Sequence, residues 1–313
     1  MNRNIFTSLL QNKWLLIWVV FASMFTRCAN SNQKDTRDTL TSGVIHVSAD
    51  ESFKPVIDSQ IQVYESQHPN AKIIVHYKPE AECLRDLNVD SIRMVIVTRG
   101  LTSKEQDILK DSLTYVPSFG VLAYDAIAVI VNNQVKDSVF KMQDIRSIAK
   151  GTSGYKYKLV MDGNSSTSTV RFVVDSLLKG EKPGTNIQGA QGSEAVIDYI
   201  SKNTDAIGLV GVSWIGNKDD PQQVSFLQKV NIASIECAGC KSGPFVKPYQ
   251  ANIYYGRYPM IRPLFYILKE NYEGLGSGFR NFLIYEKGQK IFNRAYLLPA
   301  RQRVDVKNID ISE

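Results

Sequence analysis

Short apolar runs alternate with amphipathic segments along the first third of the chain. The apolar runs have the length of strands, whereas the segments between them carry apolar residues at helical spacing. The predicted order is strand 44–48, helix 53–68, strand 71–77, helix 79–87, strand 92–97 and helix 103–110. Repeated strand–helix units of this kind predict an open, mostly parallel α/β sheet.

A second series of elements follows before the chain returns to the first. The long β-leaning run 120–132 predicts a strand that crosses between two lobes. Beyond it we expect helix 141–149, strand 155–161, helix 170–178, a strand-to-helix corner at 187–193, helix 194–202, strand 205–211, a second crossing strand at 249–255 and helices 264–272 and 279–294. Two crossings make a hinge with a cleft between the lobes, which would comprise 44–122 plus 254–313 and 123–253.

Three predicted strands end in corners that carry hydroxyl groups. Asp50 and Ser52 follow the first strand, and Thr98 follows the third. The longest corner is 162–172, where five consecutive hydroxyl residues, 165–169, separate a strand from a helix. Ligands of open α/β sheets bind outside the carboxyl ends of the strands, and all three corners would lie there.

The five-hydroxyl run has two interpretations. Amides at a helix start, the positive end of the helix dipole and adjacent hydroxyl donors together form an oxyanion site without a metal or a lysine. One or two such residues also serve as an ordinary helix N-cap, or the run is a flexible polar loop. The pattern by itself leaves both open.

Arg99, directly after Thr98, has two interpretations as well. A guanidinium pairs in bidentate fashion with an anion, and it pairs equally well with a structural carboxylate. For this residue we favour a structural or gating role.

The first 28 residues have the order of an export signal. Arg3 and Lys13 flank an apolar stretch, 14–22, that is short for a membrane span. Cys28 follows, and then the segment 29–43 has the polar composition of a flexible tether. This order resembles a bacterial lipoprotein signal in which Cys28 is the lipidated residue, and the alternative is an uncleaved N-terminal anchor. Both place the body of the protein outside the cytoplasmic membrane.

Composition and charge argue against several classes of protein. The chain has 313 residues, is 43% hydrophobic and carries a formal charge of +6 with dispersed basic residues, so it does not predict nucleic-acid binding. No histidine follows His76, which removes the serine-hydrolase order and leaves too few ligands for a metal phosphatase. The phosphate-loop motif Gly-x4-Gly-Lys-Ser/Thr does not occur. We therefore predict no enzyme activity, no metal and no cofactor. Separately, we expect the protein to be a monomer.

Cys237 and Cys240 form a CxxC motif, and a local disulfide is consistent with export. A redox motif would open a helix after a strand, whereas Gly239, Gly243 and Pro244 mark a loop here. Zinc would require two more ligands, so we reject a metal site. The disulfide stays a hypothesis.

The order of these signals resembles the phosphate-binding proteins of bacterial ABC transporters, which have the type II periplasmic binding protein fold. The resemblance extends over residues 44–299. It is carried by the segments 48–53, 97–102, 162–172 and 205–211 and by Tyr258-Pro259, Gly288-Gln289 and Leu298-Pro299. Two positions depart from the family pattern: Ser166-Thr167-Ser168 stands where Ser-Gly-Thr is expected, and Leu209 replaces a tyrosine.

The resemblance implies an α/β fold with two lobes of mixed, mostly parallel sheets joined by two crossing strands, and a phosphate site between the lobes. The implied site residues are Asp50, Ser52, Thr98, Arg99, Ser165, Ser166, Thr167, Ser168, Gly192 and Ser193. A carboxylate, Asp50 or Asp162, would accept a hydrogen bond from a protonated phosphate oxygen. This acceptor would discriminate against sulfate, which has no proton to give.

The function that the resemblance implies is capture of inorganic phosphate for a membrane permease. The protein would be a periplasmic or cell-surface lipoprotein, attached to the membrane through its N-terminal lipid. Two alternatives use the same fold: a binding protein for another oxyanion such as molybdate, tungstate or sulfate, and a phosphate sensor.

Overall fold

The structure, a computed structural model, describes residues 38–301 except 137, 155, 164 and 242. The predicted signal at 1–28, including Cys28, lies outside the described residues. In the part that is described, no helix has both the length and the apolar character needed to cross a bilayer.

One mixed sheet runs through the described chain in the order β2-β1-β3-β12-β4-β8-β6-β7, and β13 and β9 also pair with β4. The strands are β1 (Gly43–Asp50), β2 (Ala71–Lys78), β3 (Ile92–Val97), β4 (Ser118–Asn132), β6 (Lys158–Met161), β7 (Ile187–Gly189), β8 (Ala206–Gly211), β9 (Val230–Ile232), β12 (Ile261–Leu268) and β13 (Leu298–Pro299). β1 pairs in parallel with β2 and β3, and β6 pairs in parallel with β7 and β8. The predicted α/β class and the three strand–helix units at its start are confirmed.

β4 takes part in both ends of this sheet. Its first part, 118–126, pairs antiparallel with β12, and its second part, 127–132, pairs antiparallel with β8 and β9. The predicted crossing strand 120–132 is therefore confirmed. We call the strands from β2 to the first part of β4, with their helices, the first half of the sheet, and the remainder the second half.

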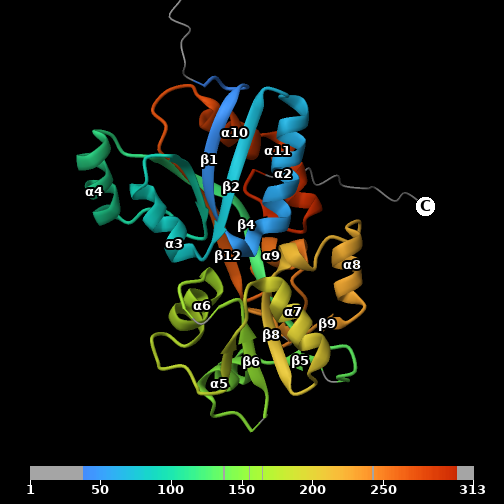
Figure 1. Cartoon of the computed structure of the whole chain (residues 1–313). Coiled ribbons are helices and arrows are strands. Elements are labelled where there is room, and N and C mark those ends of the chain that lie inside the picture. Colours follow the sequence, from blue (N-terminus) through green and yellow to red (C-terminus); the bar gives the residue numbers. More distant parts are fainter. Residues whose placement is uncertain (1–37, 137, 155, 164, 242, 302–313) are drawn as a thin grey trace, which may run out of the picture. The chain divides into compact units, whose positions relative to one another are not determined.

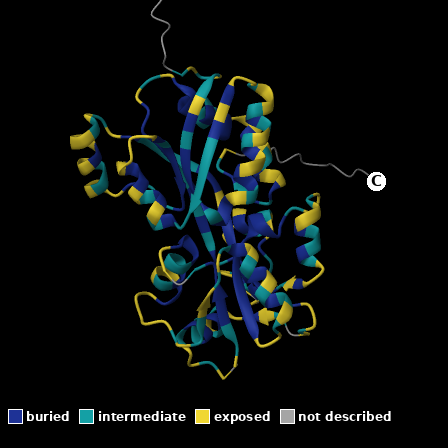
Figure 2. Cartoon of the chain, viewed as in Figure 1, coloured by how far each residue is buried: buried dark blue, intermediate teal, exposed yellow. Residues whose placement is uncertain are grey.

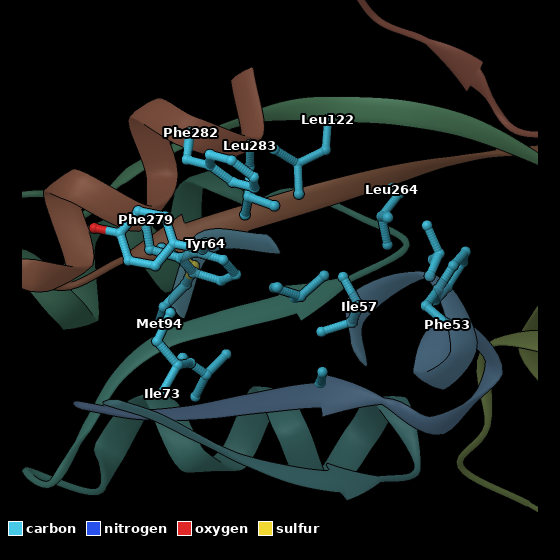
Figure 3. Packing of buried hydrophobic residues seen from close by; sticks show 14 of the residues in the cluster. Phe53, Ile57, Tyr64, Ile73, Met94, Leu122, Leu264, Phe279, Phe282 and Leu283 are labelled. Atoms are coloured by element: carbon cyan, nitrogen blue, oxygen red, sulfur yellow. The ribbon is translucent and has the colours of Figure 1, made fainter. Parts of the chain in front are cut away.

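Helices cover both faces of the first half (Figure 1). α2 (Lys54–Gln67), α10 (Leu275–Ile284) and α11 (Glu286–Arg294) pack on one face, and α3 (Glu80–Arg85) and α4 (Ser103–Leu113) pack on the other. The first face holds the larger apolar cluster, in which the Tyr64 ring meets the rings of Phe279 and Phe282 edge-on (Figure 3). Burial of this apolar surface is the main driving force for assembling the layers.

The second half has the same layered construction. α5 (Met142–Lys150) and α6 (Ser168–Phe172) pack on one face, and α7 (Ser193–Lys202) and α8 (Pro221–Leu227) pack on the other. Successive residues of β4 alternate between the two apolar clusters, because side chains of a strand point to opposite faces. β8 and the second part of β4 are accordingly wholly buried, and many of the exposed residues lie on helices and loops (Figure 2).

Two predictions in the C-terminal part are wrong. The segment 249–255 contains the short helix α9 (Gln250–Tyr254) rather than a crossing strand. The segment 264–272 is not a helix, because its first residues belong to β12, which pairs with β3 and β4. A short apolar run fits helix and strand equally well by spacing, and pairing between two strands decided this case. The strand that accompanies β4 is therefore β12.

Helix boundaries also differ from the predictions at two places. The predicted helix 279–294 is two helices, α10 and α11, which meet at Tyr285. The predicted helix 170–178 begins earlier, at Ser168, and continues as a π-type turn over 173–177. The earlier start places Ser168 and Thr169 inside the first turn of α6.

Candidate functional site

Polar side chains are buried where the two halves of the sheet meet. They come from the end of β1, the 3-10 turn η2 (Glu51–Phe53), β4, β12 and the corner between β6 and α6. The residues are Asp50, Ser52, Asp125, Asp162, Thr167, Ser168, Thr169 and Arg262, and none is more than 7% exposed. Buried polar groups require partners, so their contacts define what the region does.

Asp162, directly after β6, is the acceptor that organises this cluster. Its Oδ1 accepts a hydrogen bond from Thr167 Oγ1 at 2.9 Å, and its Oδ2 accepts one from Thr169 Oγ1 at 3.0 Å. Ser52 Oγ, from the first half, also donates to Oδ2 at 2.8 Å. Thr167 in turn caps α6, because its Oγ1 accepts from Val170 N at 3.2 Å. One carboxylate thus fixes the start of α6 and joins it to the first half.

Arg262 of β12 supplies the positive charge of the cluster. Its Nε donates to Asp125 Oδ2 at 2.9 Å, and its Nη1 donates to Ser168 Oγ at 2.8 Å and to Thr169 Oγ1 at 3.3 Å. The guanidinium also lies over the ring of Phe53, 4.9 Å from the centroid. The sequence interpretation missed this residue. The available signal was a lone arginine within the apolar run of β12, since a charge is almost never fully buried without a partner.

Asp50 ends β1 and begins η2. Its Oδ1 accepts a hydrogen bond from Ser52 N at 3.0 Å, which caps the turn. Its Oδ2 is buried and has no hydrogen-bond partner among the described residues. The pKa of Asp50 is raised to about 6, because burial and the Asp162 charge together outweigh the opposing Arg262 charge. The nearby Ser168 hydroxyl also lowers the pKa of the Asp50 carboxyl. The Asp50 carboxyl therefore changes its protonation near pH 6, and its ionised form has an acceptor oxygen that is free within the described chain.

A second cross-boundary cluster surrounds Thr98, at the end of β3. Glu80 Oε1 accepts from Thr98 N at 2.8 Å and from Thr98 Oγ1 at 2.5 Å. Arg171 of α6 donates from Nε to Glu80 Oε2 at 2.6 Å and from Nη2 to Thr98 Oγ1 at 2.7 Å. Burial would raise the pKa of Glu80, but the Arg171 guanidinium and the Thr98 donors outweigh it and hold the pKa low. The Thr98 hydroxyl is engaged within the protein.

A third contact joins Glu51 to the start of α7. Ser193 N donates to Glu51 Oε1 and Oε2, both at 3.3 Å, and Ser193 Oγ donates to Oε2 at 3.2 Å. Gly192, the N-cap residue, has a φ of 84°. The positive φ favours glycine at this position, and a Cβ atom there would also lie 2.9 Å from Glu51 Oε1. Gly192 and Ser193 thus face a carboxylate of the protein itself.

The remaining predicted site residues lie in different surroundings. Ser165 and Ser166 are exposed on the loop before α6, and Ser166 has a φ of 70°. Ser166 O accepts from Ala81 N at 2.9 Å, which ties this loop to α3. Arg99 donates to both carboxylate oxygens of Glu105, at 2.8 and 2.7 Å, as a structural residue would. The buried cluster therefore brings together four of the ten predicted residues: Asp50, Ser52, Thr167 and Ser168.

The cysteines and possible metal ligands lie outside this cluster. Cys237 and Cys240 form a disulfide beside a small sheet of β5 (Val139–Phe140), β10 (Ser234–Glu236) and β11 (Phe245–Val246). Within the described residues, no group of three or more His, Cys, Asp or Glu side chains is placed to hold a metal ion. The chemistry of the buried cluster is thus that of hydroxyl donors, carboxylate acceptors and one guanidinium.

Comparison with known proteins places this chain in a family. Residues 32–287 match the model described as the PBP superfamily domain, which covers most of the chain. No curated protein matches the sequence.

Several solved structures have a similar fold. A candidate phosphate ABC transporter substrate-binding protein with bound phosphate from Clostridium perfringens has a TM-score of 0.69 at 18% identity, over 83% of this chain and 100% of its own. An ABC-type phosphate transport receptor from Vibrio cholerae has a TM-score of 0.59 at 18% identity, over 81% and 99%. PstS from Borrelia burgdorferi has a TM-score of 0.51 at 18% identity, over 83% and 100%. At these identities the likeness shows the fold that the chains share.

Proposed function

Because the chain belongs to the PBP superfamily, whose model matches residues 32–287, we propose that it captures inorganic phosphate for an ABC importer. The bound anion would lie between two lobes, 44–122 plus 254–313 and 123–253. The proposal is supported by three solved structures of similar fold whose descriptions name phosphate transport or its binding component. The interior of this chain offers an independent argument.

The observation that carries the proposal is the position of Arg262. Its guanidinium is 3% exposed, and it donates to the hydroxyl groups of Ser168 and Thr169 at the start of α6. Ser52 reaches the same corner from the first half through Asp162. Hydroxyl donors around a buried guanidinium are the groups that bind a small oxyanion, and Arg matches the geometry of phosphate especially well. A phosphate ion would replace some of these internal contacts with its own oxygens.

Carboxylates beside this cation would select the protonation state of the ligand. Asp50 Oδ2 is buried without a hydrogen-bond partner in the described chain, and Asp162 already accepts three hydroxyl donors. Ionised Asp50 would accept the proton of a monoprotonated phosphate. Fully ionised sulfate would instead place an oxygen against this acceptor, and an unpaired buried acceptor is costly. Phosphate should therefore bind more tightly than sulfate.

We assign different roles to the residues predicted from sequence. Asp50, Ser52 and Ser168 would contact the ligand, together with Arg262 and Thr169. Thr167 would hold the start of α6 through Asp162, while Ser165 and Ser166 would form the rim of the cleft. Thr98, Gly192 and Ser193 would stabilise the closed arrangement. Thr98 accepts a hydrogen bond from Arg171 of the opposite half, and Gly192 and Ser193 approach the Glu51 carboxylate of the opposite half. Arg99 would support α4 through Glu105.

The remaining parts of the proposal concern the partner and the membrane. Closure of the two lobes around phosphate would present a surface for a membrane permease. Lipidation of Cys28, followed by the polar segment 29–43, would keep the binding domain at the outer side of the membrane. Two experiments test the anchor: treatment with globomycin, which blocks processing of lipoprotein signals, and the variant Cys28→Ser. Each should leave the signal uncleaved and so slow the protein's electrophoretic migration. Unchanged migration in both experiments would contradict lipidation at Cys28.

Isothermal titration of the purified full-length chain in detergent tests the ligand. We expect a one-to-one phosphate isotherm at neutral pH and a much weaker response to sulfate. Arg262→Lys keeps the charge but loses the forked donors, so it should weaken phosphate binding at least tenfold, about 1.4 kcal/mol. Ser59→Ala, on the exposed side of α2, is a matched control that should leave binding unchanged.

The outcomes of this titration separate the alternatives. Sulfate binding as tight as phosphate binding would remove the role of Asp50 as a proton acceptor. Heat with molybdate or tungstate but not with phosphate would keep the oxyanion site and change its ligand. Silence with all of these anions, from a chain that melts cooperatively, would mean that the buried cluster only holds the two halves together.

A further inference from the structure

The contact between Glu51 and α7 is unusual because a carboxylate of the chain occupies a position suited to an anionic ligand. α7 has ten residues, and its N-cap, Gly192, offers no side chain to satisfy the first amides. Ser193 contributes both its amide and its hydroxyl to Glu51. The N-terminal end of a helix attracts negative charge through these amides and through the helix dipole. In this protein the negative charge is built into the chain.

Glu51 reaches α7 from the other half of the sheet. It lies in η2, between Asp50, whose Oδ1 caps that turn, and Ser52, whose hydroxyl donates to Asp162. Glu51 is therefore next in sequence to two residues assigned to phosphate. Its carboxylate accepts hydrogen bonds at the start of α7, and this end of the side chain would border the proposed site.

The charges of two other carboxylates act on Glu51. Burial raises the pKa of Glu51 to about 7, with the charges of Asp162 and Asp50 adding to the rise and the Ser193 donors opposing it. The Glu51 carboxylate is thus partly desolvated, bonded to Ser193 and exposed to the charges of Asp50 and Asp162. An additional negative charge placed beside it would face like charges in a poorly solvated region.

We propose that Glu51 determines the ligand specificity of the cleft, by occupying the start of α7 and so limiting the cleft to a single tetrahedral anion. The proposal rests on the proposed function, since it concerns the same site. A ligand with one phosphoryl group would contact Arg262, the hydroxyls of Ser52, Ser168 and Thr169, and Asp50, and it would not need the start of α7. A second phosphoryl group would have to displace the Glu51 carboxylate from Ser193 or lie against it. The cleft therefore rejects pyrophosphate and related ligands with two linked anionic groups.

Substitution of Glu51 should open the start of α7 to a second anionic group. Glu51→Ala frees the amide and hydroxyl of Ser193, whereas Glu51→Gln removes the charge and keeps a side chain of equal size. The measurement is titration of the full-length protein with inorganic phosphate and with pyrophosphate at pH 8. We expect the wild type to prefer phosphate at least tenfold. Glu51→Ala should reduce that preference at least tenfold, and Glu51→Gln should reduce it by a smaller factor.

Asp220 offers a matched control within the second half. Its Oδ1 accepts from Gln222 N and Gln223 N and so caps α8, away from the carboxylate cluster. Asp220→Ala removes a carboxylate cap from a helix start, as Glu51→Ala does, and it should leave the phosphate-to-pyrophosphate ratio unchanged. Amide hydrogen exchange of the peptide that contains Ser193 should speed up in Glu51→Ala and not in Asp220→Ala.

The possible results distinguish this proposal from the proposed function. Phosphate binding with the same ratio in the wild type and in both Glu51 variants would overturn the role of Glu51 and leave phosphate capture standing. Equal wild-type affinities for phosphate and pyrophosphate would overturn it as well. A folded wild type that binds neither anion would overturn phosphate capture, and the specificity role of Glu51 would fall with it.

Discussion

The starts of α6 and α7 are two corners of the same kind that meet different groups. Both follow a strand of the second half, and both carry a serine in the first turn. The start of α6 meets Arg262 and Ser52, so its hydroxyls lie beside a cation and another hydroxyl group. The start of α7 meets the Glu51 carboxylate. A hydroxyl-bearing helix start thus becomes a candidate ligand site or an internal contact according to the residue that faces it.

This difference also concerns charge balance. Within the cluster, the Arg262 guanidinium forms an ion pair with Asp125 and donates hydrogen bonds to the hydroxyls of Ser168 and Thr169. Glu51 has neutral donors only, and the pKa of its carboxyl is raised by burial and by the neighbouring acids. Both corners contain a carboxylate, Asp162 at α6 and Glu51 at α7. The α6 corner also holds the Arg262 guanidinium, which an added anion could pair with, whereas Ser193 gives Glu51 neutral donors.

The largest expected effect comes from removal of the Arg262 side chain. Asp125 is fully buried, and Arg262→Ala would leave its carboxylate without a counter-charge. Breaking a buried ion pair in this way costs about 3–5 kcal/mol of unfolding free energy. Urea denaturation at pH 7 measures the loss. Phosphate titration of the folded fraction should show no binding.

Two further variants sharpen this prediction. Arg262→Ala combined with Asp125→Ala removes both charges and should recover part of the lost stability without recovering phosphate binding. Lys290→Ala breaks an exposed pair with Glu286, at 74% and 78% side-chain exposure, and should cost about 0–1 kcal/mol. Retained phosphate affinity in the double variant would contradict the assignment of Arg262 to the ligand.

Much of the fold could be predicted from the sequence because local pattern and tertiary packing agree there. Apart from Arg93, the run of β3 is apolar since both of its faces are covered, and β4 is recognisable by its length. Part of β12 was predicted as a helix because a short apolar run fits helix and strand equally well by spacing. Its strand conformation depends on pairing with β3 and β4, which are remote in sequence.

The candidate site was predictable only in part, for a related reason. Hydroxyl-rich corners such as 165–169 are visible as local motifs, and the structure places Thr167 and Ser168 in the buried cluster. The partners of these motifs come from distant residues: Arg262 for Ser168, Glu51 for Ser193 and Glu80 for Thr98. A single sequence shows which residues carry donors, but it does not show which donors are already engaged.

The next effect in size compares one serine from each corner. Ser168→Ala removes the acceptor of Arg262 Nη1 and a proposed ligand donor, so phosphate affinity should fall about tenfold, equivalent to about 1.4 kcal/mol. Ser193→Ala removes one donor to Glu51 and keeps the backbone amide contact, so affinity should change by less than about twofold, roughly 0.4 kcal/mol. Titration of both variants measures the contrast. Equal losses would mean that both corners contact the ligand.

The smallest expected effect is a change in the pH dependence of stability at Glu51. Its pKa is about 7 in the folded protein, above the ordinary value of 4.5, because the carboxyl is buried and lies near Asp162 and Asp50. The folded state therefore binds more protons than the unfolded state between these values. Its contribution to stability grows as the pH falls from about 7 toward 4.5, and it is smallest above pH 7.

Glu51→Gln should accordingly gain less stability than the wild type when the pH is lowered from 8 to 5.5, with the Asp50 contribution remaining in both. Urea denaturation at the two pH values gives the comparison. Glu105 is the matched control, because its pKa is shifted in the opposite direction. Its hydrogen bond with Arg99 lowers the pKa to about 2, so the contribution of Glu105 to folding stability is present above pH 4.5 and is lost toward pH 2. Glu105→Gln should leave the change between pH 8 and 5.5 as it is in the wild type. If the stability of Glu51→Gln changes between pH 8 and 5.5 as much as that of the wild type, the pKa of Glu51 is not raised by its surroundings. The contrast between the two helix starts would then rest on Arg262 alone.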